Sequence, residues 1–271
     1  MERVHVDQVY EPFISDAATD PLSCMLNFGD SHRRAVVKMY NNRQGNLSLI
    51  NEWIAAGLCR LFGISLPQSG ICFIDNNTII SEYYEKSGII SRNNYGPAFY
   101  SKYIEKTISF LPGMMSRVDK NEIANMIVFD HLVYNRDRHG GNVLIAVGKE
   151  IRFYLIDHSH IFKNDCIWDY LTFQQGMEDE DYKDEAIFDC NEYIYKQSIM
   201  YSHLQKEDIT QVVRTIQDKL TPESLHSIIQ EIPVEWSRGH NRDIEALESY
   251  VLYRAEHLSE IEDMIIRRGG L

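Results

Sequence analysis

The chain has 271 residues, of which 44% are hydrophobic and 25% charged, a composition typical of a globular protein with one large domain or two small ones. Its formal net charge of −13 argues against nucleic acid as a direct partner, because phosphate binding needs clustered lysine and arginine side chains. No apolar stretch approaches the roughly 20 residues of a membrane-spanning helix, so we expect no membrane association.

The cysteine pattern favours free thiols over a disulfide framework. The number is odd and there is no Cys-x-x-Cys pair, which suits a reducing compartment. The first residues, MERVHVDQVYEPF, lack the apolar core of a signal peptide, so we expect a cytoplasmic protein. The cysteines are Cys24, Cys59, Cys72, Cys166 and Cys190.

The first part of the chain predicts strands around one helix. The helix begins at Ser48 and ends at Gly63, and apolar residues cover nearly all of its faces, which predicts burial on both sides. Alternating apolar runs bounded by turn residues predict two pairs of strands, over residues 22–29 with 33–40 and over residues 70–74 with 78–84.

The second part predicts helices around a hairpin. Asp119, with Glu122 three residues later, indicates a helix start. We expect a connector over residues 85–115, a helix over 119–134, a hairpin formed by 143–147 and 151–157, mostly helix from 168 onward, and a long helix over 245–262. The order predicts an α+β fold with a small strand-rich half followed by a mostly helical half.

A polar loop, YNRDRHGGN, separates the predicted helix from the hairpin, and its residue types suit phosphoryl transfer. An Asp can accept the proton of a hydroxyl nucleophile, and an Asn shortly after it can bind a metal ion. The loop supplies Asp137 and Asn142, and Asp157 ends the hairpin. Because the two hairpin strands fold back on each other, Asn142 and Asp157 should return to the same end.

Lys38 is the candidate cation for the phosphates. It lies on an apolar strand, with Val36 and Tyr40 on the same face by alternation. A lysine in this position needs a partner, and the next helix offers one acid, Glu52, beside small side chains. Each residue compensates the charge of the other, which predicts a Lys–Glu pair as in protein kinases.

Together these residues resemble the HipA-like kinases, bacterial serine/threonine kinases related distantly to phosphoinositide kinases. The most specific part is the loop Asn135-x-Asp137-x-His139-x-x-Asn142. The resemblance extends over nearly the whole chain through Val36-Val-Lys38, Glu52, Ile156-Asp157-His-Ser, Thr19-Asp-Pro-Leu, Gly96-Pro-Ala-Phe and Ile232-Pro-x-Glu-Trp236.

The resemblance implies a two-lobed, protein-kinase-like fold with ATP and Mg²⁺ in the cleft. The N-lobe would comprise residues 1–84 and the C-lobe residues 85–271. A protein substrate and an antitoxin or other regulatory partner would follow from the family. The implied roles are Asp137 as catalytic base, His139 as brace of the loop, Lys38 on the phosphates with Glu52, Val36 beside the nucleotide, Ser81 and Glu82 in an adenine hinge at residues 79–83, and Asn142 and Asp157 on Mg²⁺.

The sequence departs from the family pattern at two points. Residues 15–22, the phosphate-loop region, contain no glycine, so ordinary backbone amides must bind phosphate there. His158 follows Asp157 with no Phe-Gly pair, so a flip of that segment is not implied. Relatives carry a regulatory phosphorylated serine in the phosphate loop, and Ser15, Thr19 or Ser23 could correspond to it.

Other interpretations stay open at this point. Asp, Asn and Gly most often simply form turns. Aminoglycoside and choline kinases use a similar motif, but usually with a His where this chain has Asn135. A metallohydrolase could use Asp137, His139, Asp157, His158 and His160. A pseudokinase regulator is a further alternative. The acidic run at 178–185 is either a solvated loop or a docking site for a basic partner.

Overall fold

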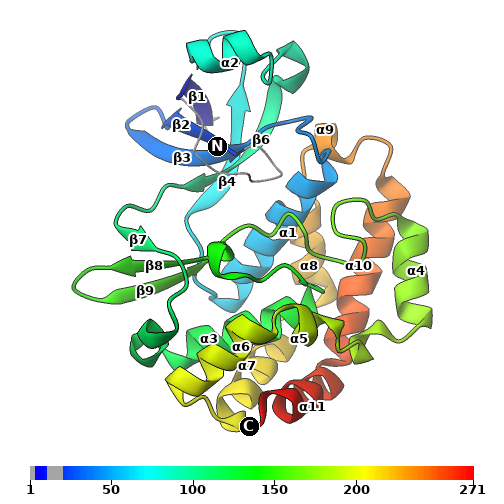
Figure 1. The fold of residues 1–271 in the computed structure, drawn as a ribbon. Helices are drawn as coiled ribbons and strands as arrows, with labels where there is room; N and C mark the ends of the chain where they lie inside the picture. Colours follow the sequence, from blue (N-terminus) through cyan, green and yellow to red (C-terminus); the bar gives the residue numbers. More distant parts are fainter. Residues whose placement is uncertain (1–3, 11–20) are drawn as a thin grey trace.

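The computed structural model describes residues 4–10 and 21–271, which form a sheet-rich N-terminal region and a helical C-terminal region (Figure 1). This is the α+β arrangement that the order of elements predicts. One apolar core lies inside the sheet, and a larger one runs through the helices. Within the described ranges, no helix has the length and apolar character needed to cross a membrane.

The N-terminal sheet curls until its first strand meets strands on both sides. The strand order is β2-β3-β6-β4-β1-β5, and β1 also pairs with β2. Inward positions alternate along the strands and carry buried side chains such as Cys24, Val37 and Cys72. The strands are β1 (Val4–Val9), β2 (Leu22–Asn27), β3 (His32–Lys38), β4 (Ser69–Ile74), β5 (Ile79–Ile80) and β6 (Gly96–Lys102).

Helix α1 (Leu47–Phe62) links the two regions. It contacts β6 and also three helices of the C-terminal region, α7 (Lys206–Lys219), α8 (Pro222–Ile229) and α9 (Val234–Ser237). The Trp53 indole N–H donates to the Ile228 carbonyl at 3.0 Å. Gly63 ends the helix with a φ of +83°, which favours glycine. The predicted helix with burial on both sides is confirmed.

A small second sheet consists of β7 (Thr107–Ile108), β8 (Val143–Val147) and β9 (Ile151–Leu155). Strands β8 and β9 form the predicted hairpin, with Val143 opposite Leu155. The Ile156 N–H donates to the Asn142 carbonyl at 3.1 Å. The two ends of the hairpin therefore lie side by side, and Asn142 and Asp157 flank them.

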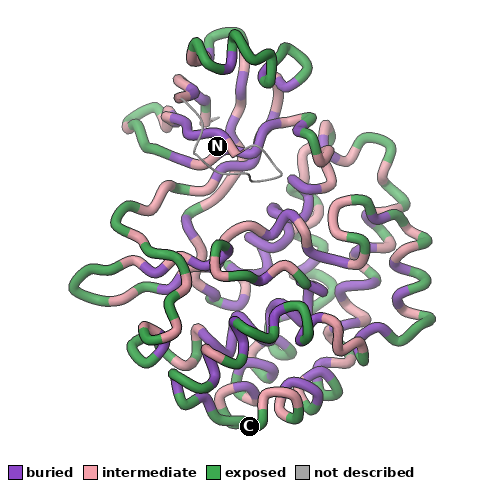
Figure 2. Tube along the Cα trace, in the orientation of Figure 1, coloured by how far each residue is buried: buried purple, intermediate pink, exposed green. Residues whose placement is uncertain are grey.

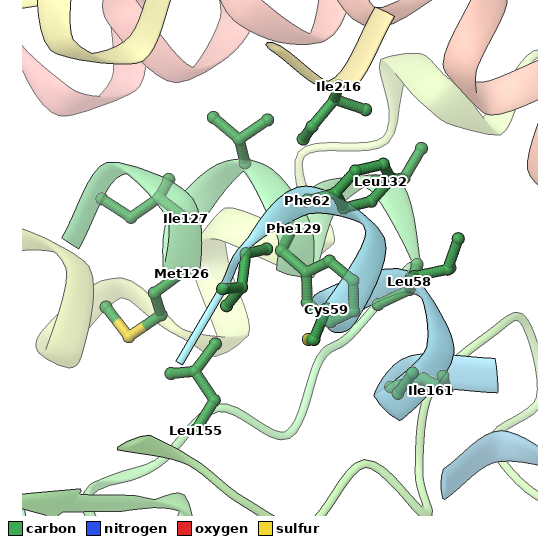
Figure 3. Packing of buried hydrophobic residues seen from close by; sticks show 14 of the residues in the cluster. Leu58, Cys59, Phe62, Met126, Ile127, Phe129, Leu132, Leu155, Ile161 and Ile216 are labelled. Atoms are coloured by element: carbon green, nitrogen blue, oxygen red, sulfur yellow. The ribbon is translucent and has the colours of Figure 1, made fainter. Parts of the chain in front are cut away.

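Helix α3 (Lys120–Leu132) runs through the buried centre of the helical region (Figure 2). The Asp119 carboxylate caps it by accepting from the Asn121 N–H at 2.9 Å. Figure 3 shows Phe129 and Leu132 of α3 packed with Leu58 and Phe62 of α1. The remaining helices are α2 (Glu82–Ser87), α4 (Tyr170–Glu178), α5 (Ala186–Cys190), α6 (Glu192–Ser202), α10 (Asn241–Glu256) and α11 (Leu258–Gly269).

Three sequence predictions differ from the structure. The strand predicted over residues 78–84 is only Ile79–Ile80, and α2 follows it. Residues 96–102, predicted as connector, form β6 between β3 and β4; the proline at its second position fits a strand start but hides the strand in the sequence. The sheet therefore extends to Lys102, past the boundary predicted after residue 84. The long late helix is broken at His257 into α10 and α11.

Candidate active site

A cavity of about 820 Å³ lies between the sheet and the helical region. Its lining comes from elements far apart in the sequence: β3, α1, the segment after β6, the polar loop of residues 135–142 and the end of β9. The predicted site residues among the lining are Val36, Lys38, Glu52, Asp137, His139, Asn142 and Asp157. The fold thus brings together groups that the sequence separates by more than 100 positions.

Lys38 is buried beside this cavity and contacts two carboxylates. Its Nζ donates to Glu52 and, at 2.6 Å, to Asp157 Oδ1. Glu52 also accepts from the backbone N–H of His158 at 3.0 Å. A strand, a helix and the end of the hairpin therefore meet at one ammonium group, and the pairing of Lys38 with Glu52 expected from the sequence is present.

Burial and charge act in opposite directions on these groups. Burial alone would lower the pKa of Lys38, but the carboxylates of Asp157 and Glu52 outweigh it and raise that pKa above its ordinary range. Burial would raise the pKa of Asp157, and the Lys38 ammonium reverses the shift. Burial raises the pKa of Glu52, which Lys38 only partly offsets. One cation is therefore shared by two carboxyl groups, and Asp157 stays ionised.

The backbone at Asp157 is unusual. Its φ is +55°, in the left-handed region that residues other than glycine rarely adopt, and such strain concentrates at functional sites. The Ser159 hydroxyl donates to Asp157 Oδ1 at 2.6 Å and fixes the side chain. The carboxylate is partly exposed and lines the cavity.

The polar loop is held by its own side chains. Asn135 Oδ1 accepts from the Asp137 N–H at 2.9 Å, and Asn142 Nδ2 donates to the Asp137 carbonyl at 2.8 Å. The His139 ring accepts from the Gly141 N–H at 3.0 Å, a contact that suits its expected bracing role. A Cβ at Gly141 would lie 2.8 Å from that ring, so a larger residue there would displace the His139 side chain. The Asp137 carboxylate stays half exposed toward the cavity.

Arg138, which sequence reasoning missed, connects this loop to the hairpin. Its side chain is fully buried and pairs with Asp130 of α3, at 2.9 Å from Nη2 and 3.0 Å from Nε. Nη1 donates to the carbonyls of Asn142 at 2.7 Å and Ile156 at 3.1 Å. One guanidinium thus fixes the backbone next to both Asn142 and Asp157. An arginine directly after a polar-loop Asp is the only sequence signal for this role.

The expected adenine hinge, residues 79–83, lies outside the lining of this cavity. Ser81 and Glu82 follow β5 at the edge of the sheet and do not line the cavity. Residues 101–104, the first two of which end β6, line the cavity. The expected phosphate loop lies mostly outside the described residues, as do Ser15 and Thr19, whereas Ser23 is buried in β2.

The histidines after Asp157 do not form the metal site of the metallohydrolase alternative. His158 is buried, and its Nε2 lies 3.0 Å from Arg138 Nη2, so this nitrogen accepts from arginine. Burial and the neighbouring Arg138 lower the pKa of His158, which keeps the ring neutral. Across residues 4–10 and 21–271, no three His, Cys, Asp or Glu side chains are grouped to bind a metal ion.

Two solved structures resemble this fold to different degrees. The proinflammatory kinase CtkA of Helicobacter pylori has a similar fold, with a TM-score of 0.62, 13% identity and 100% coverage of both chains. The HipA protein of Shewanella oneidensis, in a complex with HipB and operator DNA, matches at a TM-score of 0.45 with 11% identity over 94% of this chain and 68% of that chain. The search of curated proteins found no match.

The fold is therefore similar to that of the kinase CtkA. The family model described as HipA-like kinase matches residues 6–263, and the chain belongs to that family. The family resemblance seen in the sequence is confirmed.

Proposed function

We propose that this protein is a kinase that transfers the γ-phosphate of ATP to a serine or threonine of a protein substrate in a Mg²⁺-dependent reaction. The observation that carries the proposal is the convergence of Lys38, Glu52, Asp137, Asn142 and Asp157 on one cavity. ATP would occupy this cavity between an N-lobe that extends through β6 and a helical C-lobe. Residues 101–104 would offer backbone groups to the adenine.

Each of these residues has a chemical role in the proposal. Asp137, half exposed beside the cavity, would orient the acceptor hydroxyl and take its proton. The Lys38 ammonium would leave Asp157 and contact the phosphates, while its ion pair with Glu52 is kept.

The donor set suits Mg²⁺, which prefers oxygen ligands. Asp157 would supply an ionised carboxylate, and Asn142 its amide oxygen, since the Asn142 hydrogen bonds found among the described residues use only its nitrogen atoms and its carbonyl. The bound ion would supply charge neutralisation on the phosphates. The family resemblance supports a protein acceptor and an antitoxin-like partner, and both of these stay predictions, as does the cytoplasmic location.

Phosphoryl transfer from γ-labelled ATP with Mg²⁺, read by gel and intact mass, tests the proposal. We expect label on the wild type, or on an added protein mixture, and a loss of at least about 100-fold in Asp137→Ala, because proton transfer by a positioned base contributes that much. Asp137→Ala should still bind ATP by calorimetry, whereas Asp157→Ala should lose the Mg²⁺-dependent part of the affinity. Asp263→Ala, an exposed change on α11, is the matched control.

The opposite results are equally clear. A wild type that neither binds ATP nor transfers phosphate contradicts the proposal. Equal labelling of wild type and Asp137→Ala removes Asp137 from the chemistry. Peptide mapping of a labelled wild type would then show whether Ser15 or Thr19 accepts phosphate; the buried hydroxyl of Ser23 is the poorer acceptor.

A further inference from the structure

His160 lies between two segments of the site that come from different regions. Its Nδ1 is 3.4 Å from Asp137 Oδ2 in the polar loop, and its Nε2 is 2.7 Å from Gln44 Nε2 in the loop between β3 and α1. The ring lines the cavity and is 28% exposed. Because an ionised carboxylate can only accept, the Nδ1 of His160 must carry a proton.

Gln44 defines the other side of the ring. Its Oε1 is buried and has no hydrogen-bond partner within the described part of the chain, while its Nε2 faces the ring nitrogen. The two orientations of an amide differ by half a turn, and the reversed orientation presents Oε1 to Nε2. In that orientation His160 donates from both ring nitrogens, to Asp137 on one side and to Gln44 on the other.

The charged surroundings favour such a doubly protonated ring. The hydrogen bond to Asp137 and the contact with Cys166 raise the pKa of His160 to about 10, against the opposing effect of burial. Asp137 and Cys166 are the titratable groups that face the ring, and Gln44 carries no charge. A cationic histidine therefore stands beside the carboxylate that we assign as catalytic base.

We infer that His160 is a positioning residue for Asp137: held by Gln44, its ring fixes the carboxylate rotamer and connects the β3–α1 loop to the polar loop. The inference rests on the proposed function, because it takes Asp137 as the base. It adds a residue that touches neither the phosphates nor the adenine in that scheme. The β3–α1 loop directly follows the strand of Lys38, so the contact couples the phosphate-binding side to the base.

Kinetics of His160→Ala and His160→Gln test this role. We expect kcat to fall by about 10- to 100-fold in His160→Ala, the usual range for a residue that orients a site ligand, with the KM for ATP within about twofold of wild type. His160→Gln keeps a donor but no charge, so it should recover part of kcat. A merely structural role would show no such recovery by the glutamine donor.

An NMR titration gives a readout that does not need turnover. In protein with ¹³Cε1-labelled histidine, the His160 signal is the one absent from His160→Gln. We expect it to titrate near pH 10 in the wild type and much closer to 6.5 in Asp137→Asn. Titration near 6.5 in both proteins overturns the inference.

The outcomes separate the two proposals. A wild type without phosphoryl transfer overturns the proposed function and this role with it. An active wild type whose folded His160→Ala variant keeps full kcat overturns the role alone.

Discussion

Two buried cations, Arg138 and Lys38, lie within the same part of the molecule but in different surroundings. Arg138 is sealed below the polar loop and pairs with one carboxylate, that of Asp130, while its remaining donors meet backbone carbonyls and a neutral histidine ring. Lys38 borders the cavity and meets two carboxylates, Glu52 and Asp157. The first cluster balances one positive with one negative charge, whereas the second holds more carboxyl groups than cations.

The difference indicates what each cluster does. A buried arginine with all its directions satisfied fixes backbone geometry and has no further ligand to bind. Where two carboxylates share one lysine beside a cavity, one carboxylate can bind a second cation. The lysine ammonium can then contact an anion in the cavity. His158 connects the two clusters, because its backbone N–H donates to Glu52 and its ring accepts from Arg138. The rigid cluster therefore positions the reactive one.

The largest effect on stability is expected for Arg138→Met. This change leaves the Asp130 carboxylate buried without a cation, and breaking a buried pair from one side costs about 3–5 kcal/mol. Urea unfolding of variant and wild type would measure the loss. In Asp130→Asn/Arg138→Met the stranded charge is also removed, so the double variant should be more stable than Arg138→Met. A loss below about 1 kcal/mol in the single variant would break the comparison.

Lys38→Met should affect activity more than stability. Removal of one charge-stabilising donor typically lowers kcat by about 100- to 1,000-fold. The unfolding free energy should fall less than in Arg138→Met, because Asp157 reaches the cavity and Glu52, whose pKa burial already raises, can take up a proton. Lys86→Met is the matched control: this exposed lysine on α2 pairs with Glu82, and neither residue lines the cavity. Equal activity of Lys38→Met and wild type would remove Lys38 from the mechanism.

The sequence predicts the reactive cluster better than the rigid one. Lys38, Glu52 and Asp157 are charged residues within apolar segments. A charged side chain there is expected to be buried, so each one predicts a partner of opposite charge. Asn142 and Asp157 follow from the hairpin, because two antiparallel strands must return to the same end. The resemblance to the HipA-like kinases then implies a role for each of these residues.

Arg138 could not be predicted in the same way. Its partner Asp130 and the carbonyls of Asn142 and Ile156 come together only through tertiary packing, and an arginine in a polar loop is normally exposed. Strand β6 could not be predicted either. It is too weakly patterned around Pro97 to be distinguished from a connector, whereas the more obvious run at residues 78–84 forms a strand only at Ile79–Ile80.

A pH dependence of stability, small within any one pH unit, separates the buried interior around α3 from the cavity through two histidines. His131 of α3 is fully buried, and burial lowers its pKa to about 4, whereas the pKa of His160 at the cavity is raised to about 10. Between pH 6.5 and 4 the unfolded chain protonates His131 and the folded protein does not, so its contribution to stability is lost as the pH falls. Between pH 6.5 and 10 the folded protein keeps the His160 proton that the unfolded chain releases, so that contribution is lost as the pH rises.

We therefore expect two variants to differ from the wild type in how steeply the unfolding free energy depends on pH, one between pH 4 and 6.5 and the other between pH 6.5 and 10. His131→Phe should flatten the acid side, and His160→Gln the alkaline side, each by at most about 1.4 kcal/mol per pH unit, the value for one linked proton. Phe suits the position of His131, whose ring lies against Phe188 and Tyr195. If His131→Phe leaves the acid slope unchanged, the His131 ring is not held neutral in the folded protein, and water reaches it despite its burial. If only His160→Gln leaves its slope unchanged, the contact with Asp137 does not keep His160 protonated. The cavity then lacks the raised histidine pKa that distinguishes it from the buried surroundings of His131.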